Sequence, residues 1–164
     1  MRKIPTLFLT LGSLVFLSAC STGLKKAPMI TAERPKPNHL GFSKPVSRGY
    51  KVTQRYRPAK NRKHKGVDLA DKKGSPIFSV ASGRIIYQGR RFSGYGKMIM
   101  IAHNNGITSL YSHLNKIFVK AGQRVQRGQL VGAMGRTGRA SGVHLHFEIM
   151  KNKKVVNPET YIKF

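Results

Sequence analysis

The sequence predicts an all-β domain, and three of its features lead to that prediction. Beyond Lys44 the apolar residues come in short runs that are separated by glycine-bearing turns. No segment there repeats apolar residues with the period of about 3.6 that an amphipathic helix needs. Asn104-Asn105-Gly106 lies between two apolar runs and is typical of a tight β-hairpin turn.

Eight apolar runs are the predicted strands, and the turn residues between them indicate how neighbours connect. Asn104-Asn105-Gly106 predicts a hairpin between the third and fourth runs, and Ser82-Gly83 predicts a weaker turn between the first two. The predicted strands cover residues 77–81, 84–88, 97–103, 107–114, 116–120, 129–134, 143–150 and 155–156.

The N-terminal segment is typical of a secretory signal peptide. Basic Met1-Arg2-Lys3 precedes a mostly apolar stretch, residues 4–17, and the small residues Ser18 and Ala19 follow it. This stretch is shorter than the roughly 20 residues of a transmembrane helix, and no charged stop-transfer segment follows. We therefore leave residues 1–19 out of the fold and expect an exported protein.

The single cysteine, Cys20, ends the motif Leu17-Ser18-Ala19-Cys20, which resembles a bacterial lipobox. The resemblance implies cleavage before Cys20 and a membrane anchor of lipid on its sulfur. The alternative is an ordinary cleavage site that leaves a free thiol. Ser21 resembles the signal for sorting to the outer membrane of a two-membrane cell. We thus expect a lipid-anchored protein on the periplasmic face of the outer membrane.

Residues 20–43 read as a flexible tether, because they are poor in bulky apolar side chains and contain Pro28, Pro35 and Pro37. Residues 44–164 are enough for one domain with its own core, which we expect to be monomeric.

The chain is strongly basic, with 31 Lys and Arg residues against five Asp and Glu and a formal net charge of +26. Such a field attracts polyanions. Export directs the prediction away from nucleic acid and towards anionic envelope polymers or lipid head groups. The basic stretch from Lys44 to Lys73 is either a wall-binding rim or a plain solvated face.

Four of the six histidines lie in three short motifs, and strand geometry places their side chains on shared faces. His144 and His146 point to the same side of a strand, about 6 to 7 Å apart at Cα. His64 and Asp68 share a face in the same way, with Gly66 leaving space between them. A helix would also align these two residues, but Gly66 and the absence of a helical apolar stripe favour a strand.

Two imidazoles and one carboxylate are a suitable ligand set for catalytic zinc, which keeps a fourth position for water. We choose His64, Asp68 and His146 as ligands of one Zn²⁺ ion. His113 and His144 are then the candidates for the general base and for the donor to the oxyanion, in either order. Glu148 shares a strand face with His146 and could orient this ligand, but a residue at the rim or near a turn is the favoured interpretation.

Three motifs, in this order, are similar to those of the lysostaphin-type or LytM-domain zinc endopeptidases of bacterial cell walls: His64-x-x-x-Asp68, Ser112-His113-Leu114 and His144-x-His146. The similarity also includes Gly94-Tyr95-Gly96 and the glycine-rich residues 135–142. It implies a compact antiparallel, sandwich-like β-domain with a substrate groove, zinc at the three chosen ligands, and catalytic histidines at 113 and 144. It further implies hydrolysis of peptide cross-links in peptidoglycan.

Other residues have assignments that follow from this resemblance or from their neighbours. Some family members carry a segment that blocks the metal, but for Asn38 and His39 a solvated linker is the favoured interpretation. His103 beside the hairpin turn is expected to be structural. The candidate substrate contacts are Tyr95, Arg136, Arg139 and Ser141, with the arginines suited to carboxylates.

The main alternative function is a LytM-type module that activates other murein hydrolases, such as amidases, without cutting anything itself. Such modules typically lack several zinc-site residues, whereas all five positions are present here. An iron oxygenase could also use two histidines and a carboxylate, but export and the two further histidines favour hydrolysis. A protein that only binds anionic polymer would leave the five residues unexplained.

Overall fold

The computed structural model describes residue 36, residues 38–58 and residues 64–164, and within these it is built almost entirely of β-strands. The 3-10 helix η2 is the one helical element there, and no helix of this part is long or apolar enough to cross a membrane. In chain order the elements are β1 (Lys51–Gln54), β2 (Val67–Ala70), β3 (Pro76–Phe78), β4 (Gly83–Gly89), β5 (Met98–Ala102), β6 (Ile107–Ser112), β7 (Lys116–Ile117), β8 (Arg124–Val125), β9 (Leu130–Ala133), β10 (His144–Lys151), β11 (Lys154–Val156) and η2 (Pro158–Thr160).

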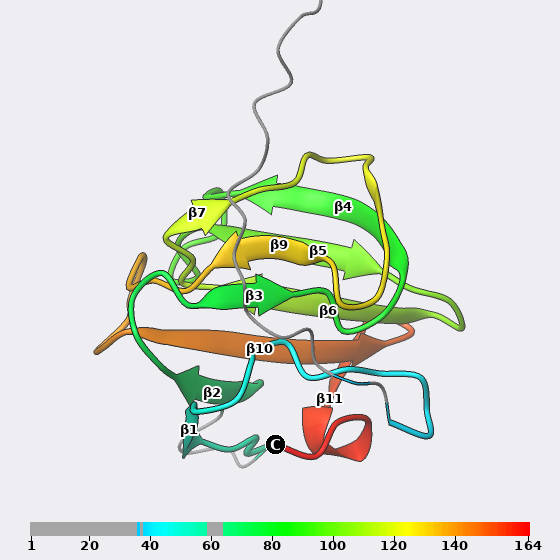
Figure 1. The fold of residues 1–164 in the computed structure, drawn as a ribbon, viewed down its shortest axis with the longest axis horizontal. Coiled ribbons are helices and arrows are strands. Elements are labelled where there is room, and N and C mark those ends of the chain that lie inside the picture. Colours follow the sequence, from blue (N-terminus) through cyan, green and yellow to red (C-terminus); the bar gives the residue numbers. More distant parts are fainter. Residues whose placement is uncertain (1–35, 37, 59–63) are drawn as a thin grey trace, which may run out of the picture.

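The strands form two antiparallel sheets, which confirms the predicted all-β, sandwich-like class (Figure 1). The large sheet has the order β1-β2-β10-β6-β5-β4-β8, and β11 pairs with the second half of β10. The small sheet has the order β3-β9-β7. In Figure 1 it lies over the β4–β6 part of the large sheet. The two sheets pack closely at Gly132 of β9, where an added Cβ atom would lie 3.7 Å from the Ile99 side chain of β5.

The core fills the space between the sheets with the apolar side of each strand's alternation. On β2, Val67 and Leu69 are fully buried while Asp68 between them faces the other side. On β10, Leu145, Phe147 and Ile149 are likewise fully buried. This burial fixes the register, because a slip of one residue would turn the whole apolar set outwards.

The predicted hairpin at Asn104-Asn105-Gly106 is confirmed. Asn105 and Gly106 both have positive φ values, 56° and 67°, as a two-residue turn of type I′ requires. The turn predicted at Ser82-Gly83 is wrong, because β3 and β4 belong to different sheets. Gly83 serves packing instead: a Cβ there would lie 2.3 Å from the Ala102 carbonyl oxygen.

Strands β1 and β8 were not predicted. β1 lies at the edge of the large sheet and is mostly exposed, so its sequence shows no apolar alternation. β8 has only two residues. The strand expected around His64 begins at Val67, and His64 itself forms an isolated bridge with Arg57.

The packed part of the chain begins before Lys44. The Asn38 side chain donates to the Tyr161 carbonyl oxygen at 2.6 Å and accepts from the backbone of Leu40 and Phe42, so this residue is not a solvated linker. His39 is exposed, and the Phe42 ring packs on Tyr161. The signal peptide, Cys20, Ser21 and the tether up to residue 35 lie outside the described residues.

Candidate functional site

The register of three neighbouring strands brings the predicted site residues together. His146 on β10 lies opposite Asp68 on β2 and, on its other side, opposite Ser112 at the end of β6. Cross-strand partners point to the same face of a sheet, so Asp68 and His146 converge. His64 reaches them from the segment before β2, and His113 follows Ser112 directly.

Three donor atoms meet at one point, and the group of His64, Asp68 and His146 could hold a metal ion. His64 Nε2 lies 3.1 Å from Asp68 Oδ1 and 3.1 Å from His146 Nδ1, and the last two atoms are 2.7 Å apart. Zinc bonds of about 2.0–2.1 Å in a tetrahedron separate neighbouring ligand atoms by roughly 3.3 Å. The residues therefore need only a small outward adjustment to fit such an ion.

The other nitrogen of each candidate histidine ligand is held by the protein. His64 Nδ1–H donates to the Arg55 carbonyl oxygen at 2.9 Å, and His146 Nε2–H donates to Glu148 Oε1 at 3.0 Å. With these protons facing outwards, both neutral imidazoles aim a lone pair at the Asp68 carboxylate. Three electron pairs that converge in this way need a cation between them, either a metal ion or added protons.

The pKa values of Asp68 and His146 are shifted because these side chains lie so close together. Burial would raise the pKa of the Asp68 carboxyl group, but the hydrogen bond and charge of His146 hold it below its usual value. Burial lowers the pKa of His146, whereas its bonds to Asp68 and Glu148 raise it further, to about 9. The site thus favours a positive charge beside two carboxylates.

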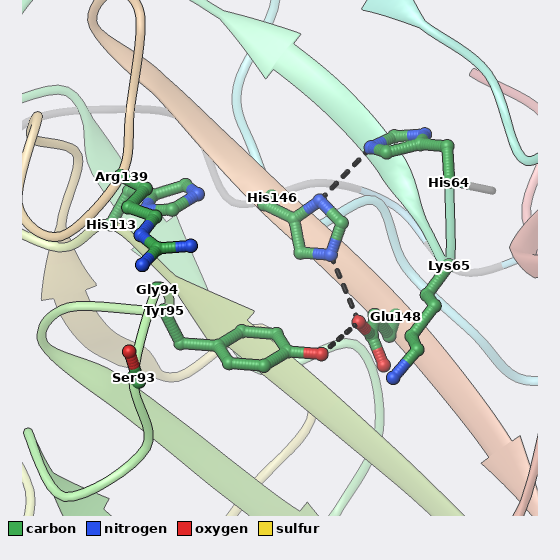
Figure 2. Close-up of a pocket in the computed structure, with 9 residues that line it drawn as sticks. All are labelled: His64, Lys65, Ser93, Gly94, Tyr95, His113, Arg139, His146 and Glu148. Atoms are coloured by element: carbon green, nitrogen blue, oxygen red, sulfur yellow. Dashed lines mark hydrogen bonds and ion pairs between the residues drawn. The ribbon is translucent and has the colours of Figure 1, made fainter. Parts of the chain in front are cut away.

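Glu148 lies beneath the site, so the favoured interpretation as a rim residue is wrong. Its side chain is 2% exposed and accepts from both His146 and the Tyr95 hydroxyl group, the latter at 2.8 Å. Burial and the charge of Glu148 raise the pKa of Tyr95, so this hydroxyl keeps the proton that it donates. Figure 2 shows the resulting chain from Tyr95 through Glu148 to His146 and His64.

His113 and His144 lie together beside the three converging residues. Their rings are 4.7 Å apart between centroids, and His144 Nε2 is 3.8 Å from Asp68 Oδ2. His113 Nδ1–H donates to the Thr137 carbonyl oxygen at 2.8 Å, and His144 Nδ1–H donates to that of Gly142 at 3.1 Å. These bonds leave each Nε2 with a free electron pair. Burial lowers the pKa of His113, which favours the neutral ring.

The backbone turns sharply at His113, where φ is 60°. Few non-glycine residues adopt this left-handed conformation, and it recurs at functional sites. Two loops hold the turn in place: Thr137 Oγ1–H donates to the Leu114 carbonyl oxygen, and Arg139 N–H donates to that of Gly94. The glycine-rich segment 135–142 thus supports His113 as well as leading into β10.

A hollow of about 410 Å³ opens over the site (Figure 2). Figure 2 places Arg139 and His113 on one side of His146, and His64 and Lys65 on the other. Of the four candidate substrate contacts, Tyr95 and Arg139 line this hollow, whereas Arg136 and Ser141 do not. Its lining residues are His64, Lys65, Ser93, Gly94, Tyr95, His113, Arg139, His146 and Glu148.

Several residues that shape the site had no signal in the sequence. The carbonyl groups of Arg55, Thr137 and Gly142 fix which histidine nitrogens face inwards, and a backbone carbonyl is the same in every residue type. Lys65 and Ser93 line the hollow only because of how their loops lie.

Comparisons with known proteins identify relatives with different functions. Murein hydrolase activator NlpD of Salmonella dublin is 36% identical over 141 residues, or 83% of this chain. DD-carboxypeptidase/endopeptidase Mpg of Neisseria meningitidis serogroup B is 43% identical over 97 residues, or 59% of this chain. The chain spans only 37% of the NlpD relative and 22% of Mpg.

Solved structures share the fold. The catalytic domain of lysostaphin from Staphylococcus simulans matches with a TM-score of 0.65 and 33% identity, over 70% of this chain and 93% of that one. A zinc containing peptidase from Vibrio cholerae matches with a TM-score of 0.66 and 35% identity, over 69% and 37%. The model of Peptidase family M23 matches residues 62–158, more than half of the sequence. The chain therefore belongs to peptidase family M23, as its motifs predicted.

Proposed function

We propose that this protein is a zinc-dependent endopeptidase that hydrolyses peptide cross-links of peptidoglycan. The observation that carries the proposal is the orientation of the histidine nitrogens. Two ring nitrogens with free electron pairs converge with Asp68 at 2.7 to 3.1 Å. Two more, on His113 and His144, lie beside them. Such a set can bind a cation and move a proton at the same place.

Zinc is the metal that suits this ligand set best. Two imidazoles and one carboxylate leave a fourth position open, and one of the similar structures is a zinc containing peptidase. When bound, zinc would polarise a peptide carbonyl group and make water acidic enough to attack it near neutral pH. Glu148 fixes the tautomer of His146 that such binding requires.

His113 and His144 handle the proton and the developing charge. One Nε2 accepts the proton of the attacking water, and the other ring, when protonated, donates to the oxyanion. The carbonyl groups of Thr137 and Gly142 keep both Nε2 atoms available throughout. Tyr95 and Arg139 line the hollow and would contact the peptide.

The second candidate function is activation of other murein hydrolases, which the similarity to NlpD favours. An activator needs only a docking surface, so it places no demand on the ring nitrogens. The retention of all five residues in working orientations is our reason for ranking catalysis first.

The cellular setting is part of the proposal. A lipid anchor at Cys20 would hold the domain at the periplasmic face of the outer membrane, next to peptidoglycan, and a basic surface would favour anionic envelope polymers. A relative from Yersinia enterocolitica is named lipoprotein NlpD and is 43% identical over 95 residues.

The test is digestion of isolated wall sacculi by wild type and by His113→Ala, with mass spectrometry of the released fragments. We expect wild type to release cross-link fragments, with release abolished by a chelator and restored by zinc. His113→Ala should keep zinc and lose about 10²- to 10⁴-fold in rate. His39→Ala is the matched control, because His39 is exposed and outside the site.

Two outcomes would reject the catalytic proposal. One is full activity in His113→Ala. The other is a wild-type protein that releases nothing by itself but stimulates a purified amidase, which would establish the activator function instead.

A further inference from the structure

A second hollow adjoins the hollow over the candidate metal site at His64 and Lys65, which line both. It measures about 390 Å³, and its other lining residues are Tyr56, Arg57, Pro58, Lys154 and Val155. Its walls therefore come from the segment before β2 and from the start of β11. His64 and Lys65, which line both hollows, lie on the side of His146 away from Arg139 (Figure 2).

The charge of this hollow is entirely positive. Arg57, Lys65 and Lys154 line it, and no acidic residue is among its described lining residues. None of the three forms an ion pair within the described part of the chain. Three acidic side chains of the described part are engaged elsewhere: Asp68 and Glu148 pair with histidines, and Glu159 pairs with Arg55. The three cations are therefore available to an anionic ligand.

One wall of the hollow is tied through its backbone to the candidate metal site. Arg57 and His64 form two backbone hydrogen bonds, each 2.9 Å long, so the residue that lines the hollow is paired directly with a candidate ligand. The His64 ring is held in addition by the Arg55 carbonyl oxygen. A group bound by Arg57 would thus lie beside the candidate metal site.

We propose that this hollow is a subsite for a carboxylate of the peptide substrate, on the His64 side of the scissile bond. The proposal rests on the function proposed above and narrows its substrate class to anionic peptides. A guanidinium group binds a carboxylate through two parallel hydrogen bonds, and two ammonium groups add point charges. Together with Arg139 at the other end, the groove would select peptides with acidic groups on both sides of the bond.

The test compares two substrates that differ only in charge: a cross-linked muropeptide dimer with free carboxylates, and the same dimer with these groups converted to carboxamides. The enzymes are wild type, Arg57→Gln and Lys154→Gln. Lys116→Gln serves as the matched control, because Lys116 is exposed on β7 and lines neither hollow.

We expect wild type to have a higher kcat/KM for the carboxylate dimer, and each variant to lose about three- to fivefold on that dimer only, mainly through KM. Added salt should reduce the preference. Equal losses on both dimers, or no loss on either, would overturn the subsite.

Binding measured by calorimetry separates this proposal from the catalytic one. If wild type cleaves neither dimer but binds the carboxylate form more tightly, and Arg57→Gln and Lys154→Gln remove that preference, the subsite stands and catalysis fails. If both dimers bind equally to wild type, the subsite is wrong whatever the protein cleaves.

Discussion

His103 and the four histidines of the site differ in which of their ring nitrogens remain free for chemistry. His103, which follows β5, uses both nitrogens within the protein: Nδ1–H donates to the Ser82 carbonyl oxygen at 3.0 Å, and Nε2 accepts from Ser109 Oγ at 2.7 Å. The four histidines of the site each have one nitrogen held by the protein or a carboxylate and the other facing the site. The residue type is the same, and the unused nitrogen is what makes the four site histidines suitable for chemistry.

The largest effect should come from the carboxylate on which the free nitrogens converge. Asp68→Asn keeps the shape but removes the negative charge, so we expect zinc affinity to fall by more than about 100-fold, beyond the usual effect of losing an orienting partner. Competition with a fluorescent chelator measures it. Asp71→Asn is the control, since Asp71 lies outside the site and, among the described residues, accepts a hydrogen bond from the backbone of Lys72 alone. Zinc bound to Asp68→Asn with wild-type affinity would show that Asp68 is not one of its ligands.

The next effect should come from the partner that orients His146. Glu148→Ala removes the acceptor of the Nε2 proton, and we expect a 10- to 100-fold loss of zinc affinity. Glu148→Gln keeps an acceptor oxygen and should lose less, and Tyr95→Phe, which removes one bond to Glu148, should lose least. The zinc affinities of the three variants are measured by the same competition, and their order is the test. Unchanged affinity in Glu148→Ala would reduce Glu148 to a packing residue.

A smaller effect should come from the loops that hold His113. A Cβ at Gly138 would lie 2.4 Å from the Gly94 carbonyl oxygen, so Gly138→Ala must push the two loops apart. Overpacking of this kind costs about 1–3 kcal/mol, and we expect slower cleavage with zinc retained. Gly74→Ala is the matched control, because its φ of 92° imposes similar backbone strain but nothing lies within 4 Å. Equal cleavage rates in the two variants would indicate that strain alone matters.

Alternation and turn chemistry were enough to predict most of the fold. The buried run on β10 and the paired positive φ values at Asn105 and Gly106 follow directly from residue type. The turn at Ser82-Gly83 could not be predicted correctly, because the glycine there serves contact with Ala102 and the chain passes between sheets. Short exposed strands such as β1 carry no apolar pattern at all.

The site was predictable only as a set of residue types. Spacing placed Asp68 and His146 on faces that could converge, and their direct pairing then depended on strand register. The left-handed backbone of His113 and the carbonyl groups that select each tautomer leave no trace in the sequence. Glu148 illustrates the limit, since its position on the strand allowed both a rim and a buried contact.

The smallest effect on activity should come from His103, and its signature is the pH dependence of stability. Burial lowers the pKa of His103, and the bond to Ser82 only partly opposes this. Between that lowered pKa and the unfolded value of about 6.5, the unfolded chain binds more protons, so stability falls as the pH drops through this range. Tyr111, linked through Ser109, stays neutral because burial raises its pKa to about 12.

His103→Gln retains a donor for Ser82 and an acceptor for Ser109 but cannot gain a proton. We expect it to lose about 1–2 kcal/mol at pH 8 through poorer geometry, and to lose less additional stability than wild type between pH 7 and pH 5. Denaturant unfolding of both proteins at the same saturating zinc concentration measures the difference, in which the contributions of the other histidines cancel. Zinc affinity and cleavage should be unchanged at pH 8. An identical pH dependence of stability in the two proteins would mean that the pKa of His103 is the same in the folded and unfolded states.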